Sequence, residues 1–157
     1  MSRAKRVIKI YTDGSCKNNP GAGGWASVIF LSEDYEVLKG WETATTNNRM
    51  ELMAIVKSLE FCVKNKSKAR FIIHSDSAYC INAITKGWLK KWSFNLWKTN
   101  SDEDIKNKDL WIEVYELLTT GVNVEFKKVK GHAGILGNEL ANKFANEQAL
   151  HALKVGV

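Results

Sequence analysis

Hydrophobic and polar positions alternate along the first third of the chain, as they do in strands with one buried face. This period of two predicts strands over residues 6–15, 25–31 and 35–45, where β-branched and aromatic residues are frequent. Turn-forming residues at 18–21 and a short polar segment at 32–34 separate the strands. Because these connections are short, the three strands are expected to form an antiparallel meander.

The hydrophobic pattern then changes to the spacing of a helix. Apolar residues recur every three or four positions from Leu52 to Leu59 and predict a helix over 48–64. The nearly continuous apolar run at 71–75 is typical of a central strand that is covered on both faces. The rest of the pattern predicts, in order, a helix over 77–86, a helix around 110–118, a strand over 122–129 and a helix over 140–148.

These elements define an α/β fold in which helices cross a mixed sheet. Three antiparallel strands come first, and strands reached through helical crossovers extend the sheet to five. The length of 157 residues predicts a single domain, 1–157, with its core over about 6–150. Because layered α/β folds host many kinds of chemistry, function has to be inferred from candidate site residues.

The composition excludes several classes of protein. With 45% hydrophobic and 25% charged residues, the chain is neither disordered nor collagen-like, and its three cysteines form no disulfide set or zinc motif. No apolar stretch approaches the roughly 20 residues that span a bilayer, and no signal-peptide pattern opens the chain. We therefore expect a soluble protein without membrane contact, in a reducing, cytoplasmic compartment.

Basic residues give a net charge of +6 and gather in segments without acidic residues. Residues 77–101 combine four lysines with three tryptophans, and two further basic clusters lie at 61–75 and 127–130. Basic segments interleaved with aromatic rings favour a polyanion with stackable bases, which is nucleic acid. The alternative is that these lysines are only solvated and the tryptophans belong to the core. For the clusters at 61–75 and 127–130 the two interpretations are equally supported.

Three carboxylates are placed where the predicted elements meet. Asp13 ends the first strand, Asp76 ends the fourth, and Glu51 lies in the first turn of the helix over 48–64. Ligands of helix-crossed sheets gather where strands end, so these side chains are expected to converge. Each has a structural alternative: Asp13–Gly14 as a turn, Asp76 as a helix N-cap, and Asn48-x-x-Glu51 as a capping box.

Considered together, the three carboxylates favour a metal site. Clustered carboxylates repel one another and are costly unless they are protonated or bound to a hard cation. Beside basic segments, such a cluster predicts divalent metal ions that act on a phosphate ester. The glycine-flanked loop 131–134 adds His132. Because histidine changes charge near neutral pH, His132 is expected to move protons during hydrolysis, the alternative being an inert surface histidine.

Five short segments occur in an order that is known from one family. They are 11–15 (YTDGS), 46–52 (TNNRMEL), 75–77 (SDS), 97–99 (WKT) and 131–134 (GHAG). Each is a weak match alone, but the ordered set closely resembles type 1 ribonuclease H of the bacterial kind. The resemblance implies the ribonuclease H-like three-layer fold and a single catalytic domain without the separate hybrid-binding domain of many eukaryotic members.

The same resemblance implies an endonuclease that hydrolyses the RNA strand of RNA/DNA hybrids and leaves 5′-phosphate and 3′-hydroxyl ends. Two Mg²⁺ ions, with Mn²⁺ as a substitute, are the implied cofactors, and we expect a monomer. Asp13, Glu51 and Asp76 are implied as metal ligands. His132 is implied to assist proton transfer or product departure.

The residues expected to contact the hybrid follow from this likeness. Four are expected to line the minor groove, where 2′-hydroxyls distinguish RNA from DNA: Cys16, Asn19, Asn47 and Asn48. Two match positions that hold a DNA phosphate: Thr46 and Asn107. A basic protrusion over about 88–98 is expected to hold the DNA strand through Trp88, Lys90, Lys91, Trp92 and Lys98.

Asn142 stands where the family has a fourth metal-binding carboxylate, ten residues after His132. Asparagine keeps a carbonyl oxygen for coordination but lacks the negative charge, so we expect a weaker second metal site and reduced turnover. One alternative is therefore a catalytically silent hybrid-binding protein, and another is a related DNA nuclease or resolvase. The retained carboxylates and His132 argue against a loss of catalysis. The Asn pair at 47–48, the tryptophan- and lysine-rich protrusion and the loop 131–134 favour the ribonuclease.

Overall fold

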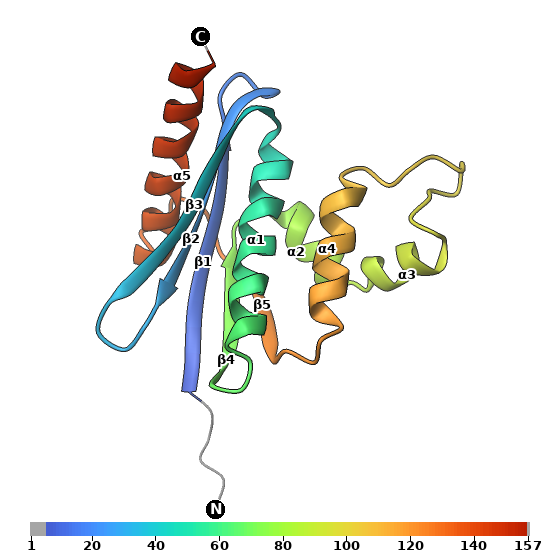
Figure 1. The fold of residues 1–157 in the computed structure, drawn as a ribbon, viewed down its shortest axis with the longest axis horizontal. Coiled ribbons are helices and arrows are strands. Elements are labelled where there is room, and N and C mark those ends of the chain that lie inside the picture. Colours follow the sequence, from blue (N-terminus) through green and yellow to red (C-terminus); the bar gives the residue numbers. More distant parts are fainter. Residues whose placement is uncertain (1–5, 157) are drawn as a thin grey trace, which may run out of the picture.

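The computed structural model describes residues 6–156, which form a five-stranded sheet and five helices (Figure 1). The strands are β1 (Arg6–Cys16), β2 (Gly21–Phe30), β3 (Tyr35–Thr45), β4 (Ala69–Ser75) and β5 (Val124–Lys128). Their order in the sheet is β3-β2-β1-β4-β5. The first three are antiparallel, whereas β4 and β5 run parallel to β1. The expected α/β fold, with three antiparallel strands followed by two parallel ones, is confirmed.

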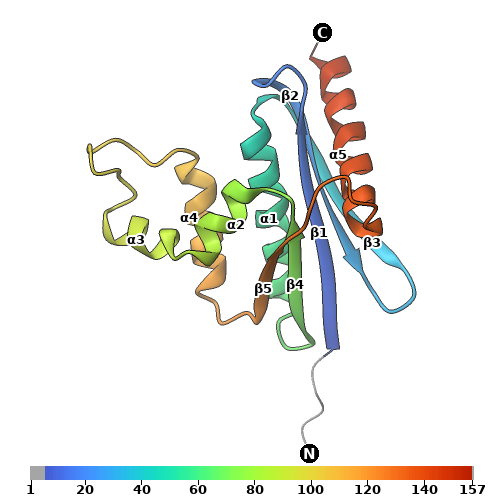
Figure 2. The same cartoon turned by 180° about the vertical axis from the view of Figure 1, so that it is seen from behind.

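Helices cover both faces of the sheet and give the molecule three layers (Figures 1 and 2). They are α1 (Asn47–Lys64), α2 (Ala78–Thr85), α3 (Trp88–Phe94), α4 (Lys108–Leu118) and α5 (Leu136–Val155). α1 lies against one face with α4 beside it, and α5 crosses the opposite face. None of the helices within residues 6–156 is both long and apolar enough to cross a membrane.

The main hydrophobic core lies between the sheet and α1. Leu52 and Leu59 of α1 share one buried cluster with Ile10 of β1 and Phe71 of β4. β4 is buried along its whole length except at Arg70, as expected of a central strand. The predicted helix and the predicted central strand are confirmed because the residues that carry their periodicity are the buried ones.

α5 packs closely on the sheet because its buried face consists largely of small residues. Four alanines on this face are fully buried: Ala141, Ala145, Ala149 and Ala152. A Cβ at Gly24 of β2 would lie 2.5 Å from the Ala145 carbonyl oxygen, so the helix and the strand are nearly in backbone contact. The predicted helix over 140–148 is only the centre of α5, since the large apolar residues near its ends are exposed and do not mark the buried face: Leu136, Leu150, Leu153 and Val155.

Parts of the structure differ from the sequence predictions. α3 is an additional helix in the tryptophan- and lysine-rich segment, and Gly87, with a φ of 76°, separates it from α2. β2 begins at Gly21 and not at residue 25, and its Gly23 and Gly24 pair with the end of β1, at Cys16 and Ser15. A glycine-rich strand has no side chains that alternate, so the hydrophobic pattern does not indicate it.

Candidate active site

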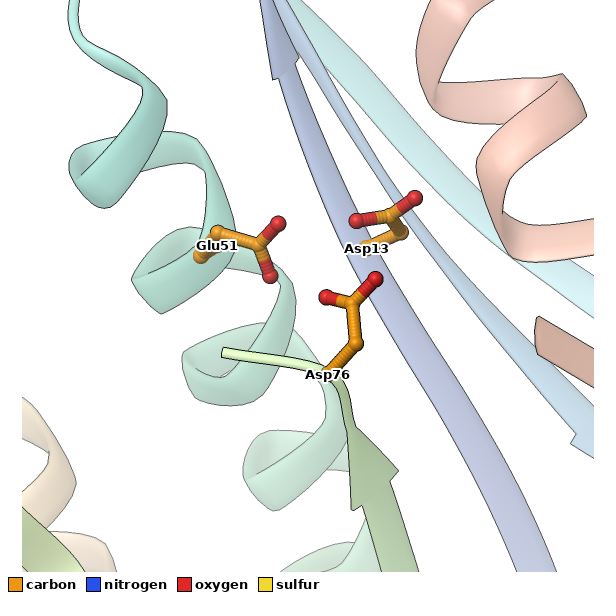
Figure 3. A group of neighbouring side chains, drawn as sticks. All are labelled: Asp13, Glu51 and Asp76. Atoms are coloured by element: carbon orange, nitrogen blue, oxygen red, sulfur yellow. The ribbon is translucent and has the colours of Figure 1, made fainter. Parts of the chain in front are cut away.

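Three carboxylates meet at one end of the central strands (Figure 3). Asp13 comes from β1, Glu51 from α1 and Asp76 from the residue after β4. One oxygen atom of each carboxylate lies within 4.8 Å of the others. Asp13 and Glu51 are buried, and Asp76 is half-buried. The structure therefore brings together the three carboxylates that were expected to converge.

Close packing between β1 and α1 brings two of these carboxylates together. A Cβ at Gly14 would overlap the backbone of Met50 and Glu51, so only glycine allows the helix to lie this near the strand. Asp76 reaches the same place because β4 is parallel to β1 and ends beside it.

The structural alternatives for the carboxylates are wrong. Thr46 is the N-cap of α1, since its Oγ1 accepts a backbone N–H of the first turn at 3.2 Å. Ser77 caps α2 in the same way at 3.1 Å. Asp13 lies within β1 rather than in a turn, and Glu51 lies in the second turn of α1 rather than in its first. Because hydroxyl groups cap the helices, the carboxylates take no part in capping.

Burial and repulsion between neighbouring carboxylates raise the pKa values of Glu51 and Asp76. The pKa of Glu51 lies well above its usual value because the side chain is buried and because Asp13 and Asp76 are close to it. The pKa of Asp76 is raised by burial and by Asp13, although a backbone hydrogen bond and the charge of His132 partly oppose the shift.

One buried oxygen of the cluster is unsatisfied. Within residues 6–156, Glu51 Oε2 has no hydrogen-bond partner. A buried carboxylate oxygen without a donor, surrounded by like charges, is a position that a divalent cation would satisfy. Carboxylate oxygens are also the ligands that Mg²⁺ and Mn²⁺ prefer, so the residues fit the implied metal.

An open cleft of about 460 Å³ gives access to the carboxylates. Four further predicted residues line it, together with Ser77 and Tyr79: Asn47, Asn48, His132 and Asn142. A Cβ at Gly131 would lie 2.9 Å from Asp76 Oδ2, so the loop that carries His132 passes directly over this carboxylate. His132 is exposed and has a left-handed φ of 57°. Its imidazole is therefore accessible from the cleft, and the side chain takes no part in core packing.

Asn142 contacts the cluster directly. Its Nδ2 donates a hydrogen bond of 2.9 Å to Asp13 Oδ2, while the N–H of Gly14 donates to the other oxygen of Asp13 at 2.9 Å. The Asn142 carbonyl oxygen, the atom expected to coordinate a metal, instead accepts a hydrogen bond of 3.1 Å from Asn146. Asn142 thus stands at the predicted place but acts as a donor.

A family model of ribonuclease H matches residues 5–150. The chain belongs to the ribonuclease H family. Ribonuclease H of Caldicellulosiruptor saccharolyticus is 45% identical over 140 residues, which cover 89% of this chain and 94% of that protein. Ribonuclease H of Francisella philomiragia is 46% identical over 143 residues, which cover 91% of each chain. These matches confirm the expected family and, with it, the expected class of nuclease.

Solved structures share the fold of this ribonuclease H. LC9-RNase H1, a type 1 RNase H with the type 2 active-site motif, matches with a TM-score of 0.82 at 28% identity, covering 97% of this chain and 76% of that chain. LC11-RNase H1 in complex with an RNA/DNA hybrid matches with a TM-score of 0.70 at 21% identity, covering 93% and 99%. The second likeness concerns the fold alone.

The residues expected at the minor groove lie together beside the cleft of this ribonuclease H. Cys16 is half-buried, with its Sγ 3.5 Å from the Thr45 carbonyl oxygen. Asn19 lies in the turn between β1 and β2, and its Oδ1 accepts the N–H of Asn47 at 3.1 Å. This contact holds the turn against the start of α1, where Asn48 faces the cleft.

The two residues expected at a DNA phosphate share one partner, Arg49. The N–H of Arg49 donates to the capping oxygen of Thr46, and its guanidinium donates to Asn107 Oδ1 at 3.4 Å. The guanidinium also forms a two-pronged ion pair with Asp109, at 2.9 and 2.7 Å. Tyr79 completes the group by accepting from Asn107 Nδ2 at 3.0 Å. Arg49 was not singled out from the sequence because the acceptors of its guanidinium, Asn107 and Asp109, are 58 and 60 positions away.

The expected protrusion carries α3 and stands away from the sheet (Figure 1). A second cleft, of about 580 Å³, is lined by four of its five expected residues: Trp88, Lys91, Trp92 and Lys98. Lys90 is exposed outside this lining. The two tryptophan rings are half-buried and pack against the core, with centroids 6.2 Å apart. Lys98 forms an ion pair of 3.0 Å with Asp104. The rings therefore stabilise the segment, while most of its lysine charge faces solvent.

Proposed function

We propose that this ribonuclease H hydrolyses the RNA strand of RNA/DNA hybrids endonucleolytically and leaves 5′-phosphate and 3′-hydroxyl ends. The observation that carries the proposal is the group of Asp13, Glu51 and Asp76, whose oxygens lie within 4.8 Å of one another below the loop of His132. The membership of the chain in the ribonuclease H family, with relatives named Ribonuclease H at 45 and 46% identity, supports the choice of substrate.

Asp13, Glu51 and Asp76 would hold two Mg²⁺ ions, with Mn²⁺ as a substitute. When bound, the ions supply an activated water and stabilise the leaving oxygen. The unpartnered oxygen of Glu51 is available for this purpose, and Asn142 completes the site beside Asp13 without adding charge. His132, exposed on the loop above Asp76, protonates the leaving 3′-oxygen and assists product departure.

The hybrid lies across the cleft and is recognised by shape, phosphates and 2′-hydroxyls. Its minor groove faces the group beside the cleft: Cys16, Asn19, Asn47 and Asn48. A phosphate of the DNA strand lies near Thr46 and Asn107. The same strand continues along the protrusion at Trp88, Lys90, Lys91, Trp92 and Lys98. The enzyme acts as a cytoplasmic monomer in which residues 1–157 form one catalytic domain.

The test compares the protein with its Asn142→Asp variant on a labelled RNA/DNA hybrid, with Mg²⁺ and with EDTA. Duplex DNA and duplex RNA are assayed in parallel. We expect metal-dependent cleavage of the hybrid alone, and faster cleavage by the variant because a fourth negative charge strengthens metal binding.

Two other results would contradict the proposal. If both proteins bind the hybrid and neither cuts it, the chain is a hybrid-binding protein, a candidate that the missing charge at Asn142 specifically favours. If duplex DNA is cut as readily as the hybrid, the protein is a DNA nuclease of the same fold.

A further inference from the structure

A chain of hydrogen bonds runs from the surface to the carboxylate cluster between β1 and α5. Lys17 Nζ and Ser15 Oγ both donate to Asn146 Oδ1, at 3.4 and 2.6 Å. Asn146 Nδ2 donates to Asn142 Oδ1 at 3.1 Å, and Asn142 Nδ2 donates to Asp13 Oδ2 at 2.9 Å. Each of the five residues that these hydrogen bonds connect is buried or half-buried.

The residues at the two ends of this hydrogen-bonded series determine which group donates and which accepts in each bond. The Lys17 ammonium can only donate, and an ionised Asp13 carboxylate can only accept. The amide oxygen of Asn146 must therefore face Lys17, and its nitrogen must face Asn142. The same logic turns the oxygen of Asn142 toward Asn146 and its nitrogen toward Asp13. If either amide were rotated by half a turn, two donors or two acceptors would face each other. The orientation therefore follows from the chemistry of the groups.

We propose that Asn146 is a positioning residue that keeps the Asn142 amide nitrogen toward Asp13 and its oxygen away from the metal site. Asn142 is then a hydrogen-bond donor to a metal ligand rather than a ligand itself. Positions 142 and 146 are one turn apart on α5 and lie on the same face, so the contact is built into the helix. The inference rests on the proposed function only in that Asp13 binds a divalent cation.

The orientation has a direct consequence for cation binding. A divalent cation attracts oxygen atoms and repels the partly positive hydrogens of an amide group. For the Asn142 oxygen to reach a cation, the amide must turn, and it then loses its hydrogen bonds to both Asp13 and Asn146. Removing Asn146 eliminates one of these two restraints and frees the oxygen to turn.

Calorimetric titration with Mn²⁺, in the absence of nucleic acid, tests this role with three variants: Asn146→Ala, Asn142→Ala and the double variant. Asn146→Ala is expected to raise the affinity for Mn²⁺ severalfold, because the Asn142 oxygen becomes available. Asn142→Ala is expected to bind Mn²⁺ at least as tightly as the unmodified protein, since no ligand is lost. The effect of Asn146→Ala is expected to disappear when Asn142 is already alanine.

Three results would overturn the inference: weaker Mn²⁺ binding by Asn142→Ala, unchanged binding by Asn146→Ala, or the same effect of Asn146→Ala in both backgrounds. A role of Asn146 in stability alone would shift the thermal midpoint in both backgrounds and leave no coupling in the Mn²⁺ affinities.

Hybrid cleavage with Mn²⁺ is measured on the same samples. Cleavage without the expected coupling removes only the role of Asn146, whereas the absence of both Mn²⁺ binding and cleavage removes the proposed function as well.

Discussion

The carboxylate cleft is assembled from distant parts of the sequence, whereas the protrusion is one continuous segment around α3. Two central strands and α1 hold the carboxylates, and the contact between β1 and α1 depends on the missing Cβ at Gly14. The protrusion stands apart (Figure 1) and is held by packed tryptophan rings and by the ion pair between Lys98 and Asp104. This difference indicates that catalysis depends on fixed positions in the cleft, while binding depends on the charge that the protrusion carries.

Asp13→Asn tests the chemical role of the cleft. The substitution replaces one of the three clustered carboxylates with a neutral amide and is expected to lower the rate of hybrid cleavage about a thousandfold or more. The fold is expected to survive because the remaining carboxylates repel one another less. Cleavage with Mg²⁺ and the thermal midpoint are the measurements. Glu33→Gln, in the exposed turn between β2 and β3, removes the same charge as a control. Near-normal cleavage by Asp13→Asn would contradict the assignment of the cleft.

Gly14→Ala and Gly87→Ala compare the two regions by stability. At Gly14 a Cβ overlaps the backbone of α1, so we expect a loss of about 2 kcal/mol or more in the free energy of unfolding. At Gly87 the space is open and only the left-handed φ of 76° opposes alanine, so a loss of about 1 kcal/mol is expected. Urea unfolding measures both. Equal losses would mean that the close approach of α1 does not limit stability.

Replacing the protrusion lysines 90, 91 and 98 with alanine tests the role of its charge. We expect hybrid affinity to fall about tenfold or more at low salt, with a shallower salt dependence because fewer counterions are released. The cleavage rate at saturating hybrid is expected to stay unchanged. The control removes three positive charges at the opposite end of β4, from Lys64, Lys68 and Arg70. An equal effect of both triple variants would place the binding surface elsewhere.

The protonation of His74, a buried residue of β4, is expected to make the stability of the fold depend on pH. This buried side chain of β4 stacks on Tyr11 with centroids 4.1 Å apart, and its Nδ1 lies 3.0 Å from the Ile10 carbonyl oxygen. Burial lowers the pKa of His74. The unfolded chain therefore takes up a proton near pH 6.5 that the folded protein does not. The contribution of His74 to the free energy of unfolding is expected to decrease as the pH falls from about 6.5 to the lowered pKa, and to be constant at pH values above about 6.5.

Urea unfolding at about pH 7.5 and about pH 5.5, with EDTA present, measures this dependence. His74→Gln is expected to reduce the loss of stability at the lower pH. His151→Gln, on the exposed part of α5, is the control for removing an imidazole. An unchanged loss in His74→Gln would show that another group is responsible.

Periodicity in the sequence predicts the parts of the fold that bury large apolar side chains, and strand ends predict where Asp13 and Asp76 converge. It does not predict α3, whose rings pack on the core from a lysine-rich segment, or the glycine-rich start of β2. The ion pair of Arg49 with Asp109 and the contact of Asn142 with Asp13 join positions 60 and 129 residues apart. Such pairs depend on the tertiary fold and leave no local pattern.

The buried alanines of α5 set the thickness of the layer between this helix and the sheet. Asn142 follows directly after Ala141, so the distance from its side chain to Asp13 depends on how flat the helix lies. A bulkier side chain at Ala149, two turns away, would force the helix backbone away from its present position on the sheet. Small residues far from any substrate therefore help to determine the distance from position 142 to Asp13.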